Sequence, residues 1–199
     1  MRKVVIVGIV VSILVFAGIR AYAGWNPLAK EEKAAEIAKK EKAADAAKKE
    51  AIEKIKVTIS EFKKRDPGMK VFFGEAYGYA VFPTVGKGAI AIGGAYGQGR
   101  VFERGNIIGS ATLKQVSIGI QLGGQSYSEI IFFKDKAALD TFTSNNLEFG
   151  ASVSAILVAS GASADTDYSN GVAIFTLPKG GLMAEASVAG QKFKFTPEE

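Results

Sequence analysis

Residues 78–102 read GYAVFPTVGKGAIAIGGAYGQGRVF, a stretch of glycine interleaved with β-branched and aromatic residues. This composition is typical of β-strands. Glycine inside strands usually marks a bulge, strong curvature or the close approach of two backbones, so the stretch predicts a sheet that curls toward a barrel. A phosphate-binding loop is excluded, because Gly94, Gly97 and Gly99 fit no nucleotide-binding pattern and open no predicted helix.

The strand character continues to the C-terminus. Apolar residues alternate with polar or small ones at 117–122 and again at 192–195. Such alternation suits antiparallel strands that have one buried face. Turns are predicted at three glycine-containing sites, Arg104-Gly105-Asn106, Asn170-Gly171 and Lys179-Gly180-Gly181.

Helices are expected before the sheet. Leu28 to Arg65 is rich in Ala, Lys and Glu and contains neither Gly nor Pro, which predicts one long helix or two in series. Asp66-Pro67 should end this segment and start a short helix that runs to about Ala76, with Asp66 as its cap.

One further helix should interrupt the strands, from Lys136 to about Thr143. Asp135 is its expected N-cap, and Leu139 and Phe142 should face inward. The predicted fold is therefore α+β: a strongly curved, glycine-rich antiparallel sheet, barrel-like in its curl, with a few packed helices and a long Ala/Lys/Glu helix in front.

The two halves of the long helix differ. Its first half, Ala34 to Ala51, has mainly alanine on its apolar side and is expected to be a solvated stalk. Its second half carries an apolar stripe within a basic helix, and two interpretations fit: the stripe packs on the domain, or it lies at a lipid interface. The residues assigned to lipid contact in the second interpretation are Lys54, Ile55, Lys56, Ile59, Phe62, Lys63, Lys64 and Arg65.

The first 23 residues have the features of an export signal. A basic start precedes the apolar run Val4 to Ile19, and Ala21-Tyr22-Ala23 matches a cleavage site after Ala23. The mature protein is then expected in the periplasm or secreted, and the alternative is an uncleaved inner-membrane anchor. The predicted domains are a signal peptide (1–23), a charged stalk or linker (24–51) and a globular domain (52–199).

The composition argues against an enzyme. The chain has no Cys and no His, so it lacks the commonest nucleophile and base pairs and the usual zinc ligands. No cofactor, metal site or catalytic residue is predicted. Residues 66–199 hold ten Lys and Arg against twelve Asp and Glu, and this acidic balance also argues against nucleic-acid binding.

Four separated strings occur in an order and spacing that resemble the SYLF domain family, known from bacterial exported proteins and eukaryotic membrane-trafficking proteins. The resemblance covers about Val57 to Thr196. It implies a lipid-binding domain with anionic lipids as ligands and a membrane-contacting amphipathic helix, which maps here to Ile52 through Arg65. The four strings are Gly78–Pro83, Gly86–Gly99, Ser117–Glu129 and Lys179–Gly190.

The expected partner is therefore an anionic phospholipid or a membrane surface. Some eukaryotic members of the family also bind actin, but an exported protein does not meet actin, so actin binding is not expected here. The same reasoning limits the ligand to anionic phospholipid in general. The alternative function is a non-enzymatic module of the cell envelope that uses its stalk as a spacer and binds another protein.

Overall fold

The computed structural model describes residues 27–90, 92–117, 125–144, 147–149, 154–164, 166–180 and 188–198. The chain divides into two compact units, Met1–Asp45 and Ala46–Glu199. Helix α1 (Pro27–Arg65) belongs to both units, so the prediction of one long helix is confirmed. Residues 32–45 all have exposed side chains, as expected for an alanine-rich stalk.

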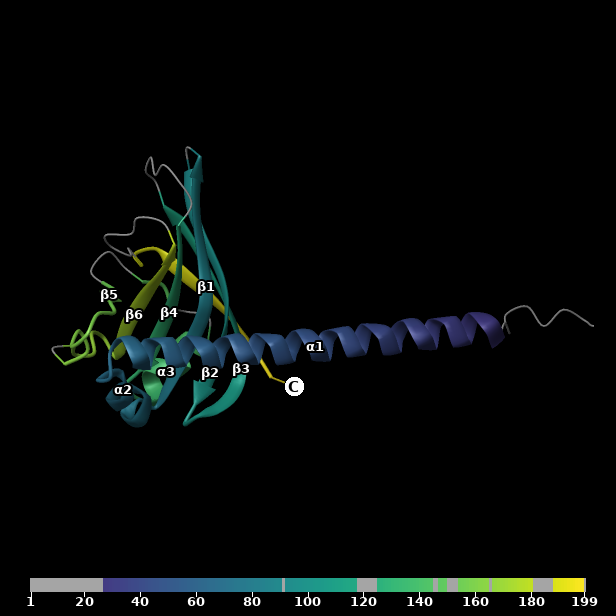
Figure 1. The fold of residues 1–199 in the computed structure, drawn as a ribbon, viewed down its shortest axis with the longest axis horizontal. Coiled ribbons are helices and arrows are strands. Elements are labelled where there is room, and N and C mark those ends of the chain that lie inside the picture. The colour runs from purple at the N-terminus through teal and green to yellow at the C-terminus, as the bar shows by residue number, and fades with distance from the viewer. Residues whose placement is uncertain are drawn as a thin grey trace, which may run out of the picture. The chain divides into compact units, whose positions relative to one another are not determined.

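The second unit contains one sheet with the strand order β5-β6-β4-β1-β2-β3-β7 (Figure 1). Together with two short helices it confirms the predicted α+β class. The strands are β1 (Gly78–Ile90), β2 (Ile92–Glu103), β3 (Asn106–Ser117), β4 (Gln125–Phe133), β5 (Ile156–Leu157), β6 (Val172–Gly180) and β7 (Gln191–Pro197). The helices are α2 (Met69–Glu75) and α3 (Lys136–Thr143).

The sheet is mixed and open, which corrects two details of the prediction. All neighbouring strands pair antiparallel except β5 and β6, which run parallel. The edges of the described sheet are β5 and β7, so the curl does not close into a barrel. The physical reason is that β5 has only two residues and offers too short a ladder to continue the sheet.

Two of the three predicted turns are confirmed. Arg104 and Gly105 have φ angles of 48° and 83°, and Asn170 and Gly171 have φ angles of 51° and 78°. Paired left-handed residues of this kind suit tight hairpin turns, where Asn and Gly adopt the conformation most readily. The third predicted turn is not tested: strand β6 ends at Gly180, and Gly181 lies outside the described residues.

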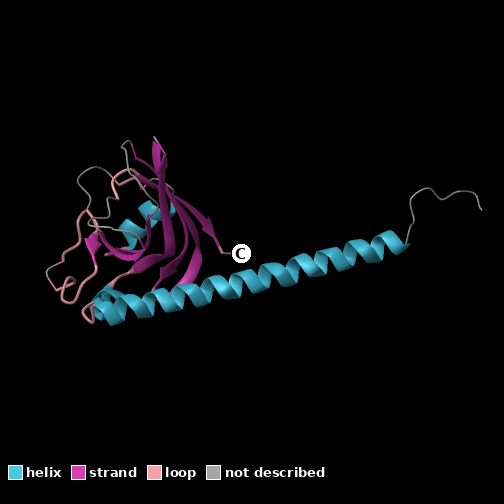
Figure 2. Ribbon diagram, turned by 45° about the horizontal axis from the view of Figure 1, so that its top comes forward, coloured by secondary structure: helices cyan, strands magenta, loops and turns pink. Residues whose placement is uncertain are grey.

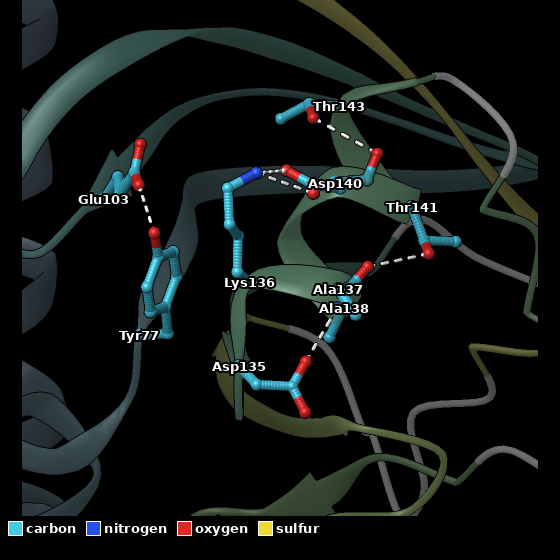
Figure 3. A network of polar contacts seen from close by, with 9 residues as sticks. All are labelled: Tyr77, Glu103, Asp135, Lys136, Ala137, Ala138, Asp140, Thr141 and Thr143. Carbon is cyan, nitrogen blue, oxygen red and sulfur yellow. Dashed lines mark hydrogen bonds and ion pairs between the residues drawn. The ribbon is translucent and has the colours of Figure 1, made fainter.

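Helix α3 forms as predicted. The Asp135 carboxylate accepts a hydrogen bond from the Ala138 backbone N–H at 2.9 Å, as an N-cap does (Figure 3). Leu139 and Phe142 are both buried. The helix therefore turns its apolar side to the sheet.

The sheet buries both of its faces. One face packs against α2 and the part of α1 that lies within the second unit (Figure 1); its largest buried members are Phe62, Met69, Ile130, Phe132 and Phe175. The other face is concave and packs on α3; its largest fully buried members are Phe82, Tyr127, Phe133, Phe142 and Phe149. We call these the outer and the concave face. Figure 2 shows the strands curving around the concave side.

Glycine and proline make the curvature possible, as predicted for the glycine-rich segment. A Cβ atom at Gly99 would overlap the carbonyl oxygen of Val81, so only glycine allows β1 and β2 to approach this closely. The register of β1 shifts against both neighbours around Pro83. Proline lacks the N–H that a central strand needs and is tolerated at such a bulge.

Candidate functional site

The apolar stripe of α1 packs on the outer face of the sheet. Ile55 is 3% exposed, Phe62 is fully buried and Ile59 is half-buried against the same cluster. The structure therefore shows the first of the two interpretations of this helix. These three side chains could enter a bilayer only after the helix had left the sheet.

The basic residues of the same helix point outward but differ in their surroundings. Lys54 pairs with Glu50 at 2.7 Å and Lys56 with Glu53 at 3.6 Å. The Lys63 ammonium lies 4.4 Å from the centre of the Phe73 ring. Each of these three residues already has a partner within the chain.

Lys64 and Arg65 line an open groove between the end of α1 and the β5–β6 edge of the sheet. The groove has a volume of about 790 Å³. Its apolar wall includes Leu157, which is 39% exposed, and Lys179 lies on the opposite side from α1. The lining residues, which we call the basic groove, are Glu61, Lys64, Arg65, Leu157, Val158, Ala159, Leu177, Pro178 and Lys179.

The basic groove brings three cations together beside exposed apolar surface. Within the part of the chain that the structure describes, Lys64, Arg65 and Lys179 form no ion pair, and Glu61 is the acidic residue of the lining. Cations without an internal partner are available to an external anion. This arrangement suits a ligand that has an anionic group next to an apolar part.

A smaller groove of about 290 Å³ adjoins the first along α1. Lys179 lines both grooves. The smaller one also contains Lys54 and Val57, whose side chain is 50% exposed. Glu50 and Glu53 also line the smaller groove and balance its two lysines, so the surplus of positive charge lies in the basic groove.

Asp66 fixes one wall of the basic groove. Its buried carboxylate accepts hydrogen bonds from the backbone N–H of Gly68 at 3.0 Å and of Ser163 at 2.7 Å. The second bond ties the loop after β5 to the end of α1. Asp66 was predicted to cap α2, but Gly68 occupies the N-cap position, because the carboxylate turns toward Ser163.

The hydrogen bonds keep this carboxylate ionised. Burial alone would raise the pKa of Asp66, but the N–H groups of Ser163 and Gly68 outweigh burial and lower the pKa below its ordinary value. A charged, buried carboxylate held by several donors is a rigid anchor. It holds the loop after β5 to the end of α1, while Leu157 itself is placed by its pairing with Thr176 on β6.

Comparison with known proteins finds a family that matches the C-terminal part of the chain. Residues 114–199 match the Ysc84 family of SYLF domains, described as "Las17-binding protein actin regulator". Residues 114–199 are therefore similar to a SYLF domain, as the resemblance in the sequence predicted. The SYLF family consists of non-enzymatic domains associated with lipid and actin binding.

A curated protein is also similar to this chain. The chain is 31% identical over 130 residues to beta cell expansion factor A from Aeromonas veronii. The match covers 64% of this chain and 49% of that protein, so the chain spans about half the length of the relative.

The basic groove combines residues inside and outside the part of the chain that matches the family. Leu157 and Lys179 lie within the residues that match the family, whereas Lys64 and Arg65 precede them. Sequence analysis identified Lys64 and Arg65 but not Leu157 or Lys179. The signal at Lys179 was a basic residue before two glycines, which predicted a turn rather than a ligand contact.

The described residues contain neither a cluster of metal-binding side chains nor a membrane-spanning helix. Among the residues that the structure describes, no three His, Cys, Asp or Glu side chains gather as a metal site would require. Across the same residues, no helix has the length and apolarity needed to cross a membrane. The predicted signal at residues 1–23 lies outside the described part of the chain.

Proposed function

We propose that this protein binds anionic phospholipid at a membrane surface through the basic groove. The observation that supports the proposal is the grouping of Lys64, Arg65 and Lys179, without ion pairs among the described residues, around the exposed side chain of Leu157. The cations would contact phosphate oxygens, and the apolar wall would contact the upper part of the acyl chains.

This proposal keeps α1 on the sheet. The predicted lipid contacts of Lys64 and Arg65 are retained, and Lys179 and Leu157 are added to them. Lys54 and Lys56 would contribute less, because binding lipid would compete with their ion pairs to Glu50 and Glu53. The buried stripe residues Ile55, Ile59 and Phe62 would contact lipid only if the helix undocked.

Removing the three groove cations should weaken vesicle binding strongly. Each basic residue near an anionic surface contributes on the order of 1 kcal/mol, so changing Lys64, Arg65 and Lys179 together to Gln should lower the affinity by roughly two decades. Binding of the unmodified protein should also weaken as salt rises, because salt screens exposed charges. Cosedimentation with vesicles of phosphatidylglycerol and phosphatidylcholine measures both effects.

A matched control removes the same charge elsewhere. Lys114, Lys134 and Lys194 are exposed, form no ion pair among the described residues and line neither groove. Their triple change to Gln should reduce binding far less. Equal losses in both variants would mean that general attraction, rather than the groove, holds the protein on the vesicle.

We also propose that the protein is exported and that its N-terminus is Gly24 after cleavage. The support is the Ala21-x-Ala23 pattern behind an apolar run. Intact mass of the protein from the periplasm or medium should lack residues 1–23. A membrane fraction that retains the full mass would instead indicate an anchor. Export would also separate the protein from actin, so lipid is the partner we propose.

A further inference from the structure

Three polar side chains meet inside the concave face of the sheet. Glu129 and Tyr127 project from β4, and Gln191 projects from β7; all three are buried. The Gln191 side-chain amide donates hydrogen bonds to the Glu129 carboxyl group at 2.9 Å and to the Tyr127 hydroxyl at 3.2 Å. Glu129 Oε1 and Gln191 Oε1 have no partner among the described residues.

The Glu129–Gln191 bond spans the concave interior. Strands β1, β2 and β3 separate β4 from β7 in the sheet, so the two side chains meet across the curl and not along a ladder. β7 is the last strand of the described sheet and pairs with β3 on one side, while Glu148 and Phe149 form a short bridge to Lys192 and Gln191 on the other. The Glu129–Gln191 bond adds a contact between this edge strand and the middle of the sheet.

The surroundings of Glu129 favour its neutral form. Its neighbours across the ladders are Phe82 on β1 and Thr176 on β6, neither of which carries a charge. Burial raises the pKa of Glu129 to about 8, although the bond from Gln191 lowers it in part. Tyr127 is the other titratable group that faces Glu129 among the described residues, and burial raises its pKa further above the ordinary value.

The nearby charged groups face away. Lys192 and Lys194 on β7 and Lys114 on β3 are exposed, as is Glu148 beside β7 and the Lys136–Asp140 pair on α3. No cation among the described residues of these elements can therefore neutralise an ionised Glu129.

We propose that the Glu129–Gln191 contact is a proton-dependent clasp, which holds β7 across the concave interior while Glu129 is neutral. When Glu129 loses its proton, the cost of burying the charge exceeds the gain from the stronger hydrogen bond, and β7 is released. The neutral group fits its apolar surroundings. The ionised group needs water, and water reaches it when the edge strand moves away. The clasp depends on contacts within residues 46–199 and not on the proposed lipid site.

Hydrogen exchange of the β7 backbone tests the clasp. An opening linked to one carboxyl group becomes up to tenfold more favourable for each pH unit between its ordinary pKa and its raised one. Protection of residues 191–197 should therefore fall, relative to the Glu129→Gln variant, by up to a hundredfold between pH 5.5 and 7.5. Comparison at each pH cancels the pH dependence of the exchange chemistry, which is the same in both proteins.

Two more variants keep the test decisive. Glu103→Gln removes a strand carboxyl group that accepts a bond from Tyr77 outside the interior (Figure 3), and it should behave as the unmodified protein does. Gln191→Leu removes the donor and should lower protection of β7 already at pH 5.5. The proposal is contradicted if protection of β7 in Glu129→Gln keeps the full pH dependence of the unmodified protein. It is also contradicted if Gln191→Leu leaves the protection of β7 at pH 5.5 unchanged. Neither measurement involves lipid, so these experiments test the clasp independently of the proposed lipid binding.

Discussion

The free energy of unfolding should fall as the pH rises from about 4.5 to about 8, by roughly 1.4 kcal/mol per pH unit, because Glu129 is buried. The folded protein keeps the proton of Glu129 over this interval, whereas the unfolded chain has released it. The contribution of neutral Glu129 to the free energy of unfolding is fully present below the pKa that Glu129 has in the unfolded chain. It is lost progressively as the pH rises to the pKa that Glu129 has in the folded protein. The total loss is on the order of 5 kcal/mol.

Urea unfolding of the unmodified protein and of Glu129→Gln at several pH values measures this effect. The glutamine side chain stays neutral, so the variant should show a much flatter profile and exceed the unmodified protein in stability near pH 8. The experiment should stay above pH 4.5, because Asp66 acts in the opposite direction: its pKa is lowered, and its contribution is lost as the pH falls. Parallel profiles for the two proteins would show that Glu129 is not a buried neutral group.

Phe62→Ala should destabilise the protein by about 3 to 5 kcal/mol, because truncating a buried Phe removes apolar burial and leaves a cavity. Phe62 is fully buried between α1 and the outer face of the sheet. Thermal melting measures the loss. Val57→Ala is the matched control on the same helix, since Val57 is 50% exposed and should change stability by no more than about 0.5 kcal/mol.

The same variant distinguishes the two interpretations of the amphipathic helix. If α1 stays docked, Phe62→Ala lowers the melting temperature. If the helix instead leaves the sheet and inserts into the bilayer, the variant keeps its melting temperature and loses vesicle binding. The second result would contradict the packed arrangement and restore Ile55, Ile59 and Phe62 as membrane contacts.

Local features of the fold could be predicted from the sequence. The long helix follows from its Ala, Lys and Glu content, and α3 follows from Asp135 before an amphipathic stretch. The turn at Arg104-Gly105 follows from the backbone preferences of its residues. Strand β7 was predicted from the alternation of Lys and Phe at 192–195, and its burial alternates in the same way. Each of these features depends on residues that are close together in the chain.

The face of the sheet on which the Glu129 side chain lies could not be predicted. Residues 127 to 133 of β4 are all buried, because the outer and concave faces are both covered, and the usual alternation of apolar and polar residues is absent. Without that alternation the sequence does not tell which residues share a face. The pairing of Glu129 with Gln191 depends further on the curl that brings β7 opposite β4.

Only one of the two walls of the basic groove could be predicted from the sequence. Lys64 and Arg65 were predicted because they lie beside the apolar stripe of an amphipathic helix. Lys179 and Leu157 come from the other wall, and nothing near them in the sequence indicates an anionic ligand. Their position depends on the pairing of β6 with β4 and of β5 with β6.

The distance along the chain between the two walls of the basic groove also affects how the protein folds. Arg65 and Lys179 are more than one hundred positions apart, so the groove requires closure of a long loop, whereas the β1–β2–β3 hairpins form between neighbouring segments. Contacts of such high sequence separation carry a larger loop-closure entropy and tend to form late. A newly made chain therefore has its hairpins before it has its groove, and it acquires the proposed affinity for anionic surfaces only when the C-terminal strands have been synthesised and docked.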